Sequence, residues 1–422
     1  MFKTLKLLFN DKNKDIRKRL LFTLGCLLIF IVGKTIPVPG TQGAVSKLGL
    51  WELYDAISGG ALEKFSIFSL GVMPYISASL ITGILQMDII PYFSELKEEG
   101  AAGRQKINQI NRYLGIALAF LQGFAMAYAF RSGVANANAL TYLKIAVILT
   151  GGTAFLLWLG DQMTQKGIGN GISLLIMAGI ISSIPNMFIE TFKALVLDNA
   201  SLFLGIVEFA IFILIYIAII VGIVYVEKSE RRIPIQYANQ TLSAYGARQN
   251  YIPFKLNSAS VMPVIFASVI FSIPSFIAGL MDKEKPFAVF VTKYVNYTTP
   301  IGFTAYILII ILFCYFYTFL QINPGELAKN LNKQGGYIPG VRPGKETKDY
   351  ISTVIGRITL LGALSIAFIA GLPIIFSSFI DTGLPSSVSL GGTSILIVIG
   401  VVLETYNQLE NSLINRNYKG GK

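Results

Sequence analysis

The chain has 422 residues, of which 53% are hydrophobic and only 14% are charged, and its formal net charge is +12. A soluble globular protein usually carries about 25% charged residues, so this chain lacks the charged surface that a soluble protein needs. It contains no His and two Cys, which excludes a disulfide framework, a zinc site and a catalytic triad that uses His.

Apolar stretches long enough for membrane helices recur along the whole chain. A bilayer core is spanned by about 20 mostly apolar residues. The predicted spans are 20–36, 72–87, 113–130, 142–160, 171–189, 203–226, 259–280, 301–321, 351–371 and 388–403. The first is predicted to be retained, because it ends in Ile36-Pro37-Val38-Pro39-Gly40 without the cleavage site of a signal peptide. The second is short and follows a Gly-rich stretch, 58–71, which indicates an element that starts partway through the membrane.

Basic residues choose the orientation of these spans. Ten spans place both termini on one side, and Lys and Arg collect on the cytoplasmic side of membrane proteins. With the tail 1–19 inside, the inside segments hold 25 Lys and Arg, whereas the outside segments together with the outer ends of their flanking spans hold nine. We therefore expect both termini in the cytoplasm and a cytoplasmic (inner) membrane location.

Ten spans also divide into two sets of five. A repeat with an odd number of spans reverses its orientation, and inverted halves commonly enclose a site or conduit near the midplane of the membrane. Residue-level similarity between the two sets is not evident, so this expectation rests on the number of spans alone.

Ionisable groups inside the spans are few. Glu208 and Arg357 each lie near a span end, where a long side chain can reach the interface. No Walker-type phosphate loop and no pair of acids with catalytic spacing is present. The sequence therefore predicts no catalytic residue, no cofactor, no metal site and no enzyme activity.

Two long cytoplasmic loops, 227–257 and 322–350, carry charge on segments rich in Gly and Pro. The second projects Arg342 between the pairs Pro339-Gly340 and Pro343-Gly344, which favour tight turns. Charge on rigid cytoplasmic loops indicates a docking surface for a large partner.

Nine short segments, in order among the ten spans, resemble the SecY family, the main subunit of the bacterial protein-conducting channel. They are Ile36 to Gly40, Ser58 to Leu62, Met73 to Ser79, Gly167 to Ser173, Arg231-Arg232 with Tyr237-Ala238, Met262 to Ser268, Asn323-Pro324, Pro339 to Gly344, and Gly391 to Ser394. The resemblance runs from about Leu20 to Ile414.

The resemblance implies an all-α membrane protein with ten transmembrane helices in two inverted five-helix halves around a central pore. A short plug helix closes the pore from outside and falls near 50–64, with Leu53, Ser58, Gly59, Gly60 and Leu62 as its candidate residues. The implied parts are a cytoplasmic tail 1–19, an N-terminal half 20–190, an external hinge 191–202, a C-terminal half 203–403 and a cytoplasmic tail 404–422.

The family's pore constriction is a ring of apolar side chains. By resemblance it falls on Val72, Ile76, Ile172, Ile176, Ile265 and Ile397. Such a ring offers no fixed hydrogen bonds to a passing chain and blocks ions because it is hard to wet. Ile172 and Ile176 lie close to the start of the fifth predicted span, whereas a ring is expected near the midplane.

The implied function is passage of unfolded secretory polypeptide, with lateral release of transmembrane segments into lipid. Signal sequences would insert between the second and third helices on one side and the seventh and eighth on the other. The implied partners are the membrane subunits SecE and SecG, the motor ATPase SecA and the ribosome. The motor and the ribosome would dock through Arg231, Arg232, Arg248 and Arg342.

The chain departs from the family's pattern at two places. The loop tip 242–253 holds only Arg248 where arginine is commonly more frequent, which puts phosphate contact by the ribosome at this tip in doubt. Val72 stands where isoleucine is common. Two other functions stay open at this stage: a ten-span secondary transporter with inverted repeats, and an insertase or scaffold without a pore.

Overall fold

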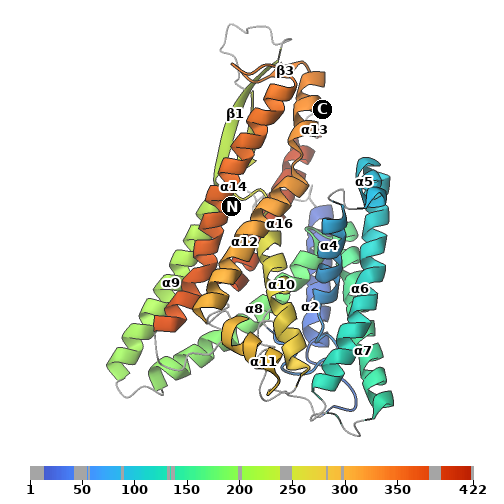
Figure 1. The fold of residues 1–422 in the computed structure, drawn as a ribbon, viewed down its shortest axis with the longest axis vertical. Helices are drawn as coiled ribbons and strands as arrows, with labels where there is room; N and C mark the ends of the chain where they lie inside the picture. Colours follow the sequence, from blue (N-terminus) through green and yellow to red (C-terminus); the bar gives the residue numbers. More distant parts are fainter. Residues whose placement is uncertain are drawn as a thin grey trace.

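The computed structural model describes residues 14–41, 55, 58–86, 90–130, 134, 138–197, 202–237, 250–281, 284–295, 299–379 and 391–419. Helices dominate these residues (Figure 1). The helices are α2 Lys14–Gly33, α4 Met73–Leu85, α5 Pro91–Glu98, α6 Ala101–Ala129, α7 Ala139–Lys166, α8 Gly171–Phe192, α9 Leu202–Lys228, α10 Met262–Gly279, α11 Pro286–Phe290, α12 Pro300–Gln321, α13 Pro324–Lys333, α14 Lys345–Phe379 and α16 Gly391–Lys419. Two π-helical turns, η4 Lys193–Leu197 and η5 Val291–Val295, extend α8 and α11.

Seven described segments are long and apolar enough to cross a membrane: α7, α8 with η4, α9, α10, α12 with α13, α14 and α16. Each of the ten predicted spans overlaps one helix. Seven of these helices belong to the segments just named, and the remaining three are α2, α4 and α6. α4 is apolar but has only 13 residues, as expected for an element that starts partway through the membrane. Large apolar side chains face outward on α9, where Phe203 is 78% exposed and Leu214 68%, and lipid suits such a face.

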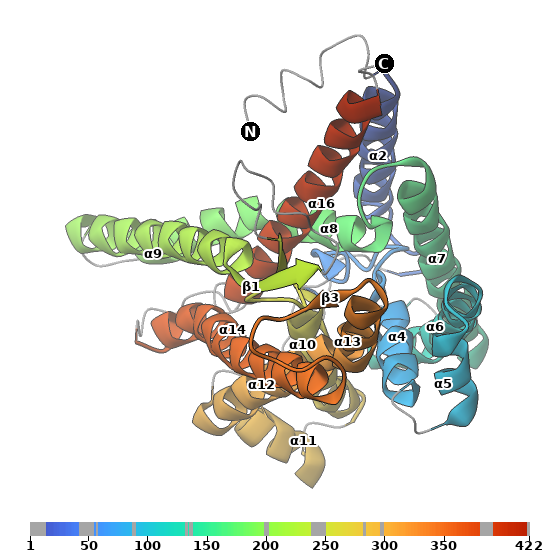
Figure 2. The ribbon, with the colours of Figure 1, turned by 90° about the horizontal axis from the view of Figure 1, so that it is seen from above.

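The helices pack in a pattern that repeats along the chain. α4 packs on α6, α6 on α7, α7 on α8, and α2 contacts both α7 and α8. The same pairs recur five helices later: α10 packs on α12, α12 on α14, α14 on α16, and α9 contacts both α14 and α16. The two groups meet where α4 contacts α10 and α8 contacts α16 (Figure 2).

α4 and α10 occupy matching places in the two groups but run in opposite directions. Figure 1 shows α4 leading to α5 at the upper end of the molecule, whereas α10 leads to α11 at the lower end. The upper end also carries α13 and the three strands, so the described parts of the predicted cytoplasmic segments 88–112, 227–257 and 322–350 lie toward one end of the structure.

A small antiparallel sheet joins the two long loops. β1 Glu230–Tyr237 pairs with β2 Asn250–Lys255 on one side and with β3 Gly336–Tyr337 on the other. Ile233 and Ile235 alternate with exposed residues along β1, as period-2 side-chain geometry requires. They pack on Ile351 and Ile355 of α14, in a core separate from the large one between the helices.

Candidate functional site: pore ring, plug and docking surface

The six predicted ring residues all lie in the large apolar core between the helices, and they come from four helices or their first turns. α4 carries Ile76 and is preceded by Val72, while α8, α10 and α16 carry the others: Ile172 and Ile176, Ile265, and Ile397. α4 contacts α10, α10 contacts α16, and α16 contacts α8, so these helices adjoin in series. Five of the six residues are buried and Ile172 is half-buried.

Most ring positions lie in the first turns of their helices. α4, α8 and α10 begin at Met73, Gly171 and Met262, within four residues of a ring position. The position of Ile172 and Ile176 near a helix start is therefore shared by Ile76 and Ile265. Ile172 packs closely against α7 at Gly160. A side chain at that glycine would crowd it, because a Cβ there would lie 3.1 Å from Ile172 Cγ1.

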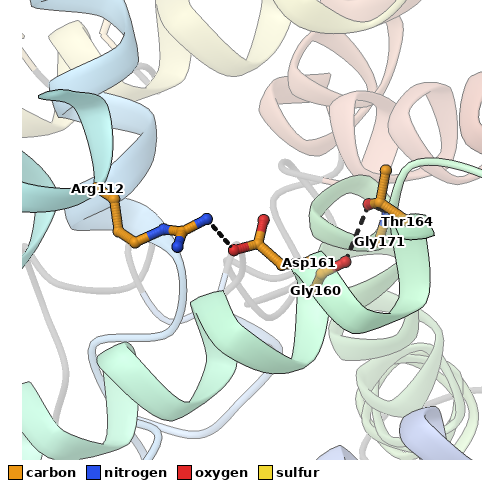
Figure 3. Close-up of polar contacts among 5 residues, drawn as sticks. All are labelled: Arg112, Gly160, Asp161, Thr164 and Gly171. Atoms are coloured by element: carbon orange, nitrogen blue, oxygen red, sulfur yellow. Dashed lines mark hydrogen bonds and ion pairs between the residues drawn. The ribbon is translucent and has the colours of Figure 1, made fainter. Parts of the chain in front are cut away.

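A polar contact fixes the turn between α7 and α8 that places Ile172. Thr164 Oγ1 donates a hydrogen bond to the carbonyl of Gly160, 2.9 Å away, and accepts one from the Gly171 N–H at 2.8 Å (Figure 3). Asn170 caps α8 by accepting from the Ile172 N–H at 3.1 Å. One turn earlier on α7, Asp161 forms an ion pair with Arg112 of α6 (Figure 3).

The turns that lead into α4 and α10 are internal copies of each other. Ser69 to Ser79 and Ser258 to Ser268 share Ser, Val, Met, Pro, Ile, Ala and Ser at seven of eleven aligned positions. Ile76 and Ile265, both predicted ring residues, occupy the same position of the repeat. Residue-level similarity between the two sets of spans, which is not evident from the spans alone, is therefore present in this segment, and the shared Val-Met-Pro is the signal for it.

The two turns also share their backbone. The residue before Val is left-handed in both, with φ +54 at Gly71 and at Ser260. The carbonyl of that residue accepts a hydrogen bond from a buried side chain in each case. Thr153 Oγ1 of α7 donates to the Gly71 carbonyl at 3.2 Å, and Asn257 Nδ2 donates to the Ser260 carbonyl at 2.9 Å. Sequence reasoning singled out neither Thr153 nor Asn257.

The described part of the predicted plug lies against α8. Gly59 has φ +75, and a Cβ there would overlap the backbone of Gly179. Ser58 and Leu62 are buried and Gly60 is half-buried, whereas Leu53 lies outside the described residues.

A buried lysine ties this segment to two helices. Lys34, just after α2, is 8% exposed. Its Nζ donates hydrogen bonds to the Gly59 carbonyl and to Ser182 Oγ of α8, the second at 2.5 Å. Because an ammonium group is costly to bury, these contacts hold the segment at one place.

Asp55 stabilises the same segment from within. Its Oδ1 accepts hydrogen bonds from the N–H groups of Leu62, at 2.9 Å, and Glu63, at 3.0 Å. Burial raises the pKa of Asp55 to about 6, although these N–H donors and the nearby Lys34 act in the opposite direction.

Three of the four predicted docking arginines, Arg231, Arg232 and Arg342, lie at the end of the molecule that carries the sheet. Arg231 and Arg232 are exposed at the start of β1. Arg232 forms an ion pair with Glu230 at 2.7 Å, and its guanidinium lies 4.7 Å from the ring centre of Tyr251 on β2. Arg248 lies outside the described residues.

Arg342 projects from a turn that is held on both sides. Gly340 and Gly344 have φ +82 and +101, which glycine adopts without strain. Thr347 Oγ1 donates to the Arg342 carbonyl at 2.8 Å, while the arginine side chain is 87% exposed. Its Nη1 lies 4.0 Å from Glu346 Oε1, a long ion pair between two exposed side chains.

Comparisons with known proteins agree on one family. The SecY family model matches residues 66–406. The protein translocase subunit SecY of Halalkalibacterium halodurans is 44% identical over 431 residues, covering 100% of this chain and 99% of that protein.

Two solved structures share the fold. One describes the plug domain of the SecY protein, which stabilises the closed state of the translocation channel and maintains a membrane seal. It has a TM-score of 0.68 and 20% identity, over 94% of this chain and 92% of that one. The other is Sec61 in the canine ribosome–channel complex from the endoplasmic reticulum, with a TM-score of 0.64 and 19% identity over the same shares. The family model and the full-length relative together place the chain in a family of membrane channel proteins: it belongs to the SecY family.

Proposed function

We propose that this chain forms the channel of a protein translocase. It conducts unfolded secretory polypeptides across the cytoplasmic membrane and releases transmembrane segments laterally into lipid. Membership of the SecY family, with full-length identity to a translocase subunit, carries this proposal. The chain itself performs no chemistry on its substrate.

The channel consists of two inverted halves of five helices, 20–190 and 203–403, joined by the hinge 191–202. The repeated packing pairs support this division, as do the duplicated turn and the opposite directions of α4 and α10. The ten helices span the membrane, with both termini and the loops 227–257 and 322–350 in the cytoplasm.

The six ring residues form the waist of the pore. They support this role because they come from four adjoining helices, belong to one apolar cluster and carry no hydrogen-bonding group. An apolar constriction resists wetting, so it blocks ions while it tolerates any passing side chain. The plug, near 50–64, closes the pore from outside through the contacts of Gly59 and Leu62.

The lateral exit lies between α4 with α6 and α10 with α12. α4 contacts α10 directly, and Gly83 of α4 lies next to Leu320 of α12. Apolar surfaces of this kind can separate into lipid at little cost, because lipid tails are as apolar as the side chains they replace. A signal sequence would open this contact by inserting an apolar helix.

The energy comes from partners. SecA or the translating ribosome docks on the upper end, through the sheet and the exposed Arg231, Arg232 and Arg342, and SecE and SecG complete the membrane complex. The arginines support this because they are exposed on rigid mounts, which suits charge-directed docking. Arg248 is retained as a docking candidate from its place in the 227–257 loop.

Reconstitution tests the function. The chain is purified with SecE and SecG, placed in vesicles, and supplied with SecA, ATP and a secretory precursor. We expect precursor to become protected from external protease, and we expect this protection to vanish without ATP or with empty vesicles. Equal protection in vesicles that lack the chain would contradict the proposal.

A further inference from the structure

The α10 turn has a serine in left-handed backbone where the α4 turn has a glycine. Glycine adopts φ +54 freely, so Gly71 can begin the α4 turn without strain. Ser260 has the same φ and carries a Cβ, which crowds the following carbonyl in left-handed backbone. Phe65 is the other described non-glycine residue with positive φ, so Ser260 is exceptional in this chain. A non-glycine residue keeps such a conformation only where its surroundings fix it.

The surroundings of the two turns share one close helix contact and differ in the side chain that binds the left-handed residue. Gly152 of α7 lets the carbonyl of Ile67 approach it closely, and Gly362 of α14 lets the carbonyl of Leu256 do the same. Both carbonyls lie four residues before the left-handed residue, so α7 and α14 support equivalent points. The residue after Gly152 is Thr153, whose hydroxyl binds the Gly71 carbonyl, whereas the residue after Gly362 is Ala363, which has no hydroxyl.

Asn257 supplies the missing donor in the second turn. It is 4% exposed, and its Nδ2 donates to the Ser260 carbonyl at 2.9 Å and to Glu227 Oε1, at the end of α9, at 2.5 Å. Its backbone is held as well, because the preceding Leu256 N–H donates to the Ser229 carbonyl at 2.8 Å. The amide therefore connects α9 to the left-handed turn from a fixed position.

We infer that Asn257, held by Glu227, is a positioning residue for the pore ring: it keeps the Ser260 turn left-handed and so places Ile265 at the waist. The inference rests on the proposed pore function. Ile265 lies one turn into α10, and its N–H donates to the carbonyl of Val261, the residue after Ser260. A change of φ at Ser260 re-aims the first turn of α10 and withdraws Ile265 from the cluster.

The test measures resting ion conductance of the reconstituted complex in planar bilayers, together with thermal stability in detergent. Asn257→Ala is expected to raise conductance about tenfold, which corresponds to about 1.4 kcal/mol lost from the closed state. Asn257→Asp is expected to raise it further, because a carboxylate donates no hydrogen bond to Ser260 and repels Glu227. Ser258→Ala, one residue along, is the matched control and should leave conductance unchanged.

The decisive variant adds Ser260→Gly to Asn257→Ala. Glycine needs no support at φ +54, so the double variant should return conductance to within about twofold of the parent. A purely structural asparagine would lower the melting temperature without leak, and glycine would not restore it. Leak that persists in the double variant, or no leak from Asn257→Ala, would overturn the inference.

Ile265→Ser separates this inference from the function on which it rests. If Ile265→Ser leaks and Asn257→Ala does not, the ring stands and the positioning role of Asn257 is overturned. If Ile265→Ser shows no leak, the proposed ring fails and the inference fails with it.

Discussion

The turns into α4 and α10 have the same backbone and the same core sequence, but they attach to different parts of the molecule. The α4 turn follows the segment that Lys34 and Gly179 hold against α8. The α10 turn follows β2, a strand of the three-stranded sheet. One turn geometry therefore leads to two of the predicted ring residues, once next to the predicted plug segment and once next to the sheet that carries the predicted docking arginines.

The two turns also differ in how they hold the left-handed residue. The Gly71 carbonyl accepts a hydrogen bond from the Thr153 hydroxyl, whereas the Ser260 carbonyl accepts one from the Asn257 amide, which also donates to Glu227. Left-handed backbone costs a non-glycine residue about 1–2 kcal/mol. Of the two left-handed residues that begin these turns, only Ser260 therefore carries this strain.

Charge reversal at the docking end is expected to have the largest effect. Arg342→Glu should lower SecA-driven transport into vesicles at least about tenfold, because like charges at a docked interface cost several kcal/mol. The protein should remain folded, since the side chain is 87% exposed. Lys293→Glu, on η5 at the opposite end, is the control, and transport by Arg342→Glu equal to that of the control would exclude a docking role for Arg342.

Exchanging the residues at the two turns tests whether left-handed backbone strains the protein. Gly71→Ser should destabilise the protein by about 1–2 kcal/mol, because serine then carries the strain without an asparagine in support. Ser260→Gly should stabilise it by less than about 1 kcal/mol, since glycine also gains entropy in the unfolded chain. Thermal unfolding in detergent measures both, and a Gly71→Ser protein as stable as the parent would show that the turns are not strained.

Removing the buried cation tests the plug side. Lys34→Met keeps the length of the side chain but leaves the Gly59 carbonyl and Ser182 without their donor. An unmade buried hydrogen bond costs about 1–3 kcal/mol, so resting conductance should rise about tenfold. The matched control is Lys64→Met, because Lys64 is exposed on the same segment. Equal conductance for the two variants would mean that Lys34 does not seat the plug.

External pH should have a smaller effect on the same side. Burial raises the pKa of Asp55 from 3.8 to about 6 in this structure, so the proposed plug binds the proton more tightly when seated as here than when Asp55 is hydrated. Closure is therefore favoured as external pH falls from 7 toward 5 and is weakened as it rises. Resting conductance should be lower at external pH 5 than at pH 7, and Asp55→Asn should remove this difference. The opposite slope in the parent would contradict the assignment.

Much of the fold was predictable from the sequence because lipid imposes a simple rule on helices. Every predicted span overlaps a helix, but α14 begins six residues before its predicted span and α16 extends well past its own. Those extra turns are polar, and hydropathy cannot distinguish a helix that continues into water from a loop.

The sheet and the supports of the turns were not predictable in this way. Ile233 and Ile235 give too short an alternation to indicate a strand, and Pro253 in β2 argues against one. Asn257 looks like an ordinary loop residue, and Thr153 like an ordinary helical one. Their partners, the Ser260 and Gly71 carbonyls, become evident only when the chain is folded. The ring residues, in contrast, came from family resemblance, since apolar residues at helical spacing usually mark packing.

The ring itself is tested most directly by replacing Ile76, Ile176 and Ile265 together with Ser, and measuring resting conductance and thermal stability on the same preparation. Burying an isoleucine side chain away from water is worth roughly 1.5–3 kcal/mol, so the apolar waist favours the closed state. We expect a large rise in conductance with a melting temperature close to that of the parent. A clear loss of stability without leak would show that these residues are packing residues, because buried hydroxyls would then lack partners.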